Sequence, residues 1–177
     1  PFETKAGIVG SPAVAGDTLF VAAGNRLFAL EPKTGQPRWP QPFTAGDRVW
    51  SNLVVGGDTI YFGAMDHKVY ALSLANGEAR WPPFATKGAV ASTPLVAGDT
   101  IYVGSFDGGL YAINATTGQP RWSQPFRAGG WVWGQPVAQG DRVYFGALDK
   151  QVYAVQAATG QAAWSMPYTT SAPVRAS

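Results

Sequence analysis

The sequence predicts an all-β fold made of four repeated sheets, and three observations predict it. An eleven-residue segment with Ala first, Gly seventh and Trp last occurs four times, and its tryptophans lie 41 or 42 residues apart. A repeat of about forty residues is typical of a β-propeller with one four-stranded blade per repeat. Helical periodicity is absent, and short apolar runs alternate with turns that contain Gly. The four segments span residues 29–39, 71–81, 112–122 and 154–164.

The third repeat shows how the first half of a blade is expected to form. A short apolar strand over 94–97 meets Gly98 and Asp99, a pair typical of a tight hairpin turn. The second strand, over 100–104, is rich in β-branched and aromatic residues, and its counterparts read TLFVAA, TIYFGA and RVYFGA. These runs are nearly continuous in apolar residues, which indicates sheets covered on both faces, as in blades that pack face to face.

The second half of this blade follows a turn at 106–108. A third strand is predicted over 110–114, and after the TTGQP turn we expect a fourth strand to begin at Arg121 and Trp122. Four short antiparallel strands are the content of one propeller blade. The predicted fold class is therefore an all-β propeller of four-stranded antiparallel blades, with four blades in this chain.

The blade boundaries follow from aligning the repeats. Residues 43–72 align without gaps to residues 126–155, which indicates that a pair of blades was duplicated. Residues 168–177 resemble the start of the chain, so we expect them to begin a further repeat. Every blade has four strands of its own, and no strand is left over to close a ring by overlap. The expected blades lie at about residues 6–43, 48–84, 88–126 and 131–167.

The composition argues against several classes of protein. Charged residues make up 14% of the chain, the net charge is +2 and no basic run occurs, so nucleic-acid binding receives little support. The chain has no Cys, which excludes a disulfide scaffold and thiolate metal ligands. No apolar run reaches the roughly 18 residues that a membrane-spanning helix needs. Because the chain starts at Pro1 rather than Met, we expect a processed product or a piece of a longer protein.

The repeated segment resembles the tryptophan-docking motif of the pyrroloquinoline quinone (PQQ)-like repeat family. It has the same Ala-x-x-x-x-Thr-Gly-x-x-x-Trp spacing, preceded by a Gly-Asp hairpin, and the resemblance covers essentially the whole chain. The resemblance implies that each indole stacks between blades, against the motif glycine of a neighbour, where a Cβ would block its approach. The docking residues implied in this way are Trp39, Trp81, Trp122 and Trp164 with Gly35, Gly77, Gly118 and Gly160.

Members of this family include quinoprotein alcohol dehydrogenases, the periplasmic propeller lipoprotein that assists outer-membrane barrel assembly, and extracytoplasmic sensor domains of bacterial Ser/Thr kinases. The resemblance therefore implies a bacterial, extracytoplasmic location, in the periplasm or at the cell surface. These proteins usually have seven or eight blades, so four is a departure. Two interpretations stay open, and both are favoured over a closed ring of four blades. Either two chains join as half-rings in an eight-bladed homodimer, which covers the apolar faces of the end blades, or the chain is a fragment.

The enzymatic members need groups that this sequence lacks. The resemblance implies a calcium site with Glu, Asn and Asp ligands, a general-base Asp and a vicinal Cys pair over PQQ, whereas the chain has no Cys. Acidic residues that recur from blade to blade are explained by turn formation. They are Asp17, Asp58, Asp99 and Asp141 in one turn and Asp66, Asp107 and Asp149 in another. His67, the only histidine, is expected at the surface. We therefore predict no catalytic residue, no metal site and no cofactor, with PQQ as the alternative.

The candidate binding site lies on the linkers between blades. In propellers these linkers share a face with the turns between the second and third strands, and that face usually carries ligands or partners. Trp50 and Trp133 occupy matching positions, so an alternative is that they plug the inner packing of the blades. Trp131 has Arg48 as its counterpart and is expected to be exposed. The candidate binding residues, of types enriched in binding hot spots or positively charged, are Lys5, Arg48, Trp50, Lys87, Arg127, Trp131 and Trp133.

The sequence favours a non-catalytic recognition module, either a scaffold or a sensing domain of a larger bacterial extracytoplasmic protein. Such a module binds a protein partner or a small ligand on its linker face. Two alternatives stay open. One is a PQQ-binding sensor domain of a receptor Ser/Thr kinase, in which Trp and Arg side chains stack on and pair with the anionic, planar quinone. The other is a fragment of a PQQ-dependent dehydrogenase.

Overall fold

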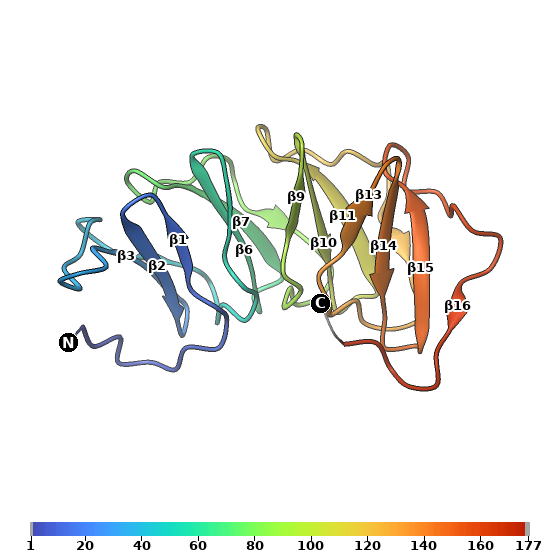
Figure 1. Ribbon diagram of the computed structural model, residues 1–177, viewed down its shortest axis with the longest axis horizontal. Coiled ribbons are helices and arrows are strands. Elements are labelled where there is room, and N and C mark those ends of the chain that lie inside the picture. The colour runs from blue at the N-terminus through green and yellow to red at the C-terminus, as the bar shows by residue number, and fades with distance from the viewer. Residues whose placement is uncertain (1, 176–177) are drawn as a thin grey trace.

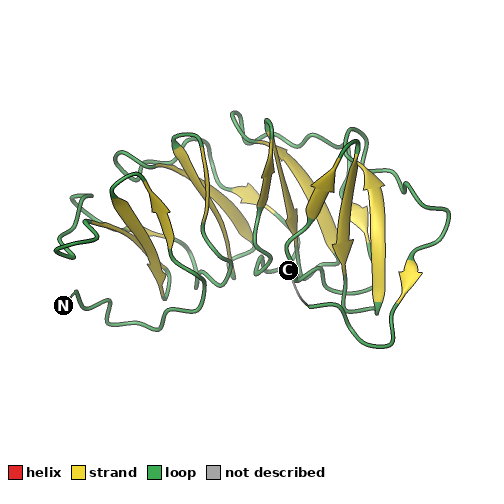
Figure 2. Ribbon diagram, viewed as in Figure 1, coloured by secondary structure: helices red, strands yellow, loops and turns green. Residues whose placement is uncertain are grey.

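The computed structural model describes residues 2–175, which form four sheets of four antiparallel strands each. Figure 2 shows strands joined by loops, and no helix occurs within these residues. The sheets stand side by side in a row, with the N-terminal sheet at one end and the C-terminal sheet at the other (Figure 1). The expected all-β architecture of four blades is therefore confirmed.

The strands of each blade follow one another in chain order within the sheet. The first blade holds β1 (Ala13–Ala15), β2 (Thr18–Ala23), β3 (Arg26–Leu30) and β4 (Phe43–Thr44). The second holds β5 (Val54–Gly56), β6 (Thr59–Ala64), β7 (Lys68–Ser73) and β8 (Phe84–Ala85). The third holds β9 (Leu95–Ala97), β10 (Thr100–Gly104), β11 (Gly109–Asn114) and β12 (Phe126–Arg127). The fourth holds β13 (Val137–Gln139), β14 (Arg142–Gly146), β15 (Gln151–Gln156) and β16 (Tyr168–Thr169).

The hairpin between the first and second strands forms at the Gly-Asp pair, as the sequence predicts. In the third blade Thr100 of β10 pairs with Ala97 of β9, which leaves Gly98 and Asp99 as a two-residue turn. Gly98 has a φ of +60°, the left-handed conformation that the first place of a type II′ turn requires. The Asp of this turn also pairs with the Arg before the motif tryptophan in three blades. These exposed pairs, each worth at most about 1 kcal/mol, are Arg38–Asp17, Arg80–Asp58 and Arg121–Asp99.

The fourth strand begins later than the sequence analysis expects. Arg121 and Trp122 lie outside any strand, and β12 begins only at Phe126. Pro120, just before them, has no N–H to donate to a strand ladder. The indole of Trp122 leaves its own sheet for the next blade, where its Nε1 donates a hydrogen bond to the carbonyl oxygen of Ala157 at 3.0 Å. The docking segment is therefore a turn between β11 and β12, with a single bridge to the sheet.

The C-terminal segment corrects the expectation that residues 168–177 begin a further repeat. Tyr168–Thr169 form β16, which pairs with β15 and completes the fourth sheet. Residues 170–175 follow as a linker, in which the Val174 N–H donates to the carbonyl oxygen of Ala147 at 3.1 Å. Residues 176–177 lie outside the described residues. The expected boundaries are shifted because each repeat ends with its short outer strand, and a linker of about nine residues then precedes the next first strand.

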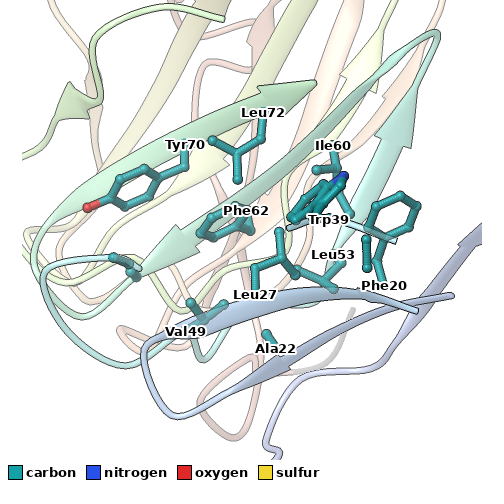
Figure 3. Packing of buried hydrophobic residues seen from close by; sticks show 13 residues of the cluster. Phe20, Ala22, Leu27, Trp39, Val49, Leu53, Ile60, Phe62, Tyr70 and Leu72 are labelled. Atoms are coloured by element: carbon teal, nitrogen blue, oxygen red, sulfur yellow. The ribbon is translucent and has the colours of Figure 1, made fainter. Parts of the chain in front are cut away.

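The hydrophobic core lies between neighbouring blades. At the first joint Phe20 and Leu27 of the first blade face Ile60, Phe62 and Leu72 of the second (Figure 3). All five residues are fully buried. Every residue of β6 is buried, whereas in β14 of the last blade only Val143 and Phe145 are buried. The continuous apolar runs thus mark strands that are covered from both sides, and the end blade lacks a neighbour on one side within residues 2–175.

An indole lies against a glycine at each of the three joints. A Cβ built on Gly77 would lie 2.8 Å from Trp39, and one on Gly118 would lie 2.6 Å from Trp81. At the third joint a Cβ on Gly160 would lie 2.5 Å from Trp122. Each indole also donates from Nε1 to a backbone carbonyl of the next blade. These acceptors are Leu74, Ala115 and Ala157, at 3.0, 3.1 and 3.0 Å.

Candidate functional site

One face of the row of blades is built from the linkers and from the turns between second and third strands. The Ala45 N–H donates to the carbonyl oxygen of Asn25 in the preceding turn, at 2.8 Å. The Met65 N–H of the next turn donates back to the carbonyl oxygen of Arg48 in the linker, at 2.9 Å. Each linker is therefore fixed to the turns of both blades that it connects. We call this surface the linker face.

An Asp–Tyr pair anchors each linker to the turn between the second and third strands of the blade that follows it. In the third blade Asp107 accepts hydrogen bonds from the Tyr111 hydroxyl, from the Lys87 N–H at 3.0 Å and from the Gly109 N–H at 2.7 Å. The second and fourth blades repeat this arrangement with Asp66, Tyr70 and Gly46, and with Asp149, Tyr153 and Gly129. Turn formation, which the sequence predicts for these Asp residues, does not account for their Tyr partners, although a Tyr four residues after each Asp is visible in the sequence.

The carboxylate of Asp107 is committed to this anchor. Burial acts to raise its pKa, but the hydrogen bonds from Tyr111, Gly109 and Lys87 and the charge of Arg127 outweigh burial and hold the pKa below its ordinary value. The Nη1 atom of Arg127 lies 3.1 Å from Asp107 Oδ1. A carboxylate held in this way stays ionised and fully hydrogen-bonded, so it serves the structure of the linker face rather than proton transfer.

The tyrosines of the anchors have raised pKa values. Burial, reinforced by the hydrogen bond to Asp66, raises the pKa of Tyr70 to about 12. Burial and the hydrogen bond to Asp149 do the same for Tyr153, whose pKa is also about 12. Ionisation of either phenol would place a negative charge beside a carboxylate, so the anchors need protonated tyrosines.

We expect these anchors to fail in alkali. Below pH 10 both phenols are protonated in the folded and the unfolded chain, so their raised pKa values contribute their full stability. As the pH rises from 10 to about 12 the unfolded chain loses protons that the folded chain keeps, and the free energy of unfolding falls. Urea unfolding followed by tryptophan fluorescence at a series of pH values should show this fall. It should be shallower in the double variant Tyr70→Phe/Tyr153→Phe, while Tyr168→Phe, at an exposed position, should match the parent chain.

The most exposed aromatic side chain of the linker face is Trp131. It is 48% exposed, yet its ring is stacked on Phe106 at 4.4 Å between ring centroids and an angle of 8°. Trp133 contacts the same Phe106 ring at 4.9 Å and 37°. The sequence does not reveal the role of Phe106, because only the fold brings the turn between β10 and β11 under the linker that follows β12. The three rings form a fixed cluster, which we call the aromatic platform.

The residue that plugs the packing between blades is the valine just before Trp50 and Trp133. Val49 and Val132 are 2% and 0% exposed. A Cβ on Gly104 would lie 2.4 Å from Val132, so this valine fills the space over a glycine of β10. Trp50 and Trp133 are only half-buried. The inner packing between blades is therefore filled by a valine rather than by these two tryptophans, which lie beside it.

A family model that matches nearly the whole chain identifies its family. The family model described as the outer membrane protein assembly factor BamB matches residues 2–91 and, a second time, residues 84–177. The chain belongs to this family. No curated protein sequence matches it at a significant level.

Solved structures similar to this BamB-family chain have the propeller fold that the sequence predicts. The computationally designed Ika8 protein is 15% identical with a TM-score of 0.80, over 93% of this chain and 50% of that one. BamB from Moraxella catarrhalis is 20% identical with a TM-score of 0.78, over 92% of this chain and 54% of that one. A quinohemoprotein alcohol dehydrogenase, ADHIIG from Pseudomonas putida HK5, is 16% identical with a TM-score of 0.75, over 97% of this chain and 35% of that one. The chain thus spans about half the length of the first two.

The remaining candidate residues do not join the aromatic platform of this BamB-family chain. Arg127 and Lys87 line a groove of about 700 Å³ at the outer edge of the blades, together with Tyr111, whose ring lies 5.9 Å from the Arg127 guanidinium. Trp131 is not among the residues that line this groove. Lys5 is exposed, with a φ of +56°. The candidate residues therefore fall into separate groups instead of one pocket that encloses a planar ligand.

Two further properties of the described part of the BamB-family chain concern metals and membranes. Residues 2–175 bring no three His, Asp or Glu side chains together in a group that could hold a metal ion. They also include no helix long and apolar enough to cross a membrane.

Proposed function

We propose that this chain is a non-catalytic recognition module of a bacterial extracytoplasmic protein, which binds a protein partner on its linker face. The observation that carries the proposal is the aromatic platform, in which half of the Trp131 surface is exposed while its ring is held flat on Phe106. An aromatic side chain that is already fixed loses little conformational entropy on binding. Trp is also the residue type most typical of the central anchor of a protein interface.

A charged side chain beside the platform fits the rim of such an interface. Lys150 is exposed in the turn between β14 and β15. The Leu148 N–H of that turn donates to the Trp131 carbonyl oxygen at 2.9 Å, so the turn lies next to the linker that carries the platform. Arg48 is exposed on the linker between the first and second blades, away from the platform. A hydrophobic centre with charged residues at its edge is the usual composition of a protein–protein contact.

The family description also supports a protein partner. That description, outer membrane protein assembly factor, names a role in assembling other proteins, and we extend to this chain a protein partner of that class. The extracytoplasmic location is proposed on the same ground. We also propose that a second copy of the chain covers the two end blades, so that two chains make one ring of eight blades. This pairing leaves the linker face free for the partner.

Trp131→Ala is expected to weaken partner binding by about 30-fold, because it removes the exposed half of the platform. Its effect on the free energy of unfolding should stay within about 1 kcal/mol, since the side chain is half-exposed. A photo-reactive phenylalanine analogue at position 131 should cross-link to a protein of the outer-membrane assembly machinery in intact cells. The matched control is the same analogue at Thr116, an exposed position at the opposite end of the strands. Equal cross-linking from both positions would contradict a binding site on the linker face.

The PQQ-binding alternative is tested separately. PQQ is titrated with calcium into the chain while tryptophan fluorescence and the melting temperature are followed. We expect no saturable change, because Arg127 is engaged by Asp107 and lies in a groove that Trp131 does not line. A saturable response at micromolar PQQ that Trp131→Ala abolishes would replace the protein-binding proposal with a quinone sensor.

A further inference from the structure

The two end blades carry the two halves of a joint that is complete elsewhere in the chain. At the C-terminal end Trp164 is half-buried and tilted on Tyr144, at 5.7 Å and 54°, as Trp122 is on Tyr102 at 5.7 Å and 47°. No glycine among residues 2–175 lies under this indole. At the N-terminal end Gly35 has a φ of +72°, within a few degrees of the glycines at the three joints, and no indole lies on it.

An apolar cavity lies on the outward face of the first blade and is lined by Pro37 and Trp39 of the segment that contains Gly35, although Gly35 itself does not line it. It has a volume of about 210 Å³ and is lined by apolar side chains that include Phe28, Leu30, Pro37 and Trp39. The corresponding cavity of the third blade, lined by the equivalent residues Tyr111, Pro120 and Trp122, has about 80 Å³. There the neighbouring Trp81 lies on the motif glycine.

Several apolar side chains at the two ends are more exposed than their equivalents in the interior of the row. Ile8 is 52% exposed, whereas its equivalents Val49, Val90 and Val132 are at most 2% exposed. Val14, which faces away from the second blade, is 65% exposed. At the other end Val137 and Tyr168 are 60% and 67% exposed, whereas their equivalents in the preceding blades are partly buried. Exposed apolar surface of this extent at both ends of one molecule is typical of interaction sites.

We infer that the Trp164 indole of one copy lies on Gly35 of a second copy, as the indoles of the three interior joints lie on their glycines, and that the reciprocal contact closes the ring. This inference rests on the pairing proposed above and names the residues that make it. The outer faces of the first and the fourth blade are complementary, because they correspond to the two sides of the joint that occurs three times within the chain. Two copies related by a two-fold axis satisfy both ends at once. By analogy with the interior joints, Trp164 Nε1 donates to the carbonyl oxygen of Pro32 in the second copy.

The joint requires one local rearrangement. Phe2 packs edge-on against Phe28 at 5.2 Å, as Phe126 of the outer strand β12 packs against Tyr153 of the next blade at 5.3 Å. In a joint between copies, Tyr168 of the second copy is the residue equivalent to Phe126. Phe2 and that tyrosine therefore compete for one place, and residues 2–5 leave the first blade when the copies pair. Phe2→Ala is accordingly expected to tighten the pairing.

The test is the mass of the full chain in solution, by sedimentation over a range of concentrations. The parent chain should be a dimer of twice 18.7 kDa, without larger species. Trp164→Ala should raise the dimer dissociation constant by about 30-fold or more, while Trp131→Ala should leave it unchanged. Gly35→Ala should weaken the dimer in the same way. Its control is Gly16→Ala, where φ is +56° and no atom lies within 4 Å, so the backbone strain is similar and no indole is displaced.

Three outcomes overturn the inference. A monomeric parent chain at high micromolar concentration overturns both the pairing and the joint. A dimer that survives Trp164→Ala and Gly35→Ala overturns the joint alone, provided that both variants keep the circular dichroism spectrum of the parent. A series of oligomers whose size increases with concentration would show that copies join end to end without closing a ring of two, which also contradicts the inference. None of these outcomes touches the linker face, which is tested through Trp131.

Discussion

Trp81→Ala is expected to lower the free energy of unfolding by about 3–5 kcal/mol, as replacement of a buried tryptophan by alanine typically does. The side chain is 5% exposed, and its indole lies on Gly118 of the third blade. Its Nε1 also donates to the carbonyl oxygen of Ala115 at 3.1 Å. The variant loses apolar contact on both sides of the joint and leaves that carbonyl with only the hydrogen bond from the Tyr61 hydroxyl, at 3.3 Å. Urea unfolding followed by circular dichroism measures the change.

A milder variant of the same residue separates the ring from its hydrogen bond. Trp81→Phe keeps an aromatic ring over Gly118 and loses the Nε1 donor, so it should cost clearly less than Trp81→Ala. Trp131→Ala, at an exposed position, serves as the control for the loss of an indole as such. A Trp81→Ala variant as stable as the Trp131→Ala variant would show that this indole does not hold the blades together.

Gly118→Ala is expected to destabilise the chain by about 3 kcal/mol, for two reasons that add. Gly118 has a φ of +70°, where an L-residue costs about 1–2 kcal/mol. The new methyl group would also lie 2.6 Å from Trp81 Cδ2, which forces the indole out of its place and adds about 1–3 kcal/mol of overpacking. Thermal and urea unfolding both report the loss.

The matched control for this change lies in the same blade. Gly98 has a φ of +60°, and a Cβ there meets no atom within 4 Å. Gly98→Ala therefore carries the backbone strain alone, about 1–2 kcal/mol. The difference between the two variants isolates the contact with the indole. Equal losses in the two variants would contradict a close approach of Trp81 to Gly118.

Much of the fold can be predicted from the sequence because the same pattern of strands and turns occurs four times in the chain. The period of the motif predicts the blades, and the Gly98-Asp99 pair predicts the first hairpin at the position where the structure has it. The continuous apolar run of β10 predicts burial on both faces. These features are local or periodic, so one chain contains enough copies to expose them.

The positions that could not be predicted depend on contacts between distant segments. The outer strands are only two residues long, and their pairing with the third strand is set by the path of the docking segment rather than by strand propensity. The anchor of Asp107 on the Lys87 N–H joins residues that are twenty positions apart. Phe106 becomes part of the candidate site only because the linker carries Trp131 over it. In each case a residue of ordinary type acquires its role from the neighbouring blade.

The central claim is that neighbouring blades are held together by an indole that needs a glycine beneath it. A double-mutant cycle between Trp81→Ala and Gly118→Ala measures this directly, with the free energy of unfolding as the readout. Once the indole is absent, Gly118→Ala should cost only its backbone strain, about 1–2 kcal/mol as at Gly98, so the two changes should couple by about 1–3 kcal/mol. Additive losses, within about 0.5 kcal/mol, would contradict the claim.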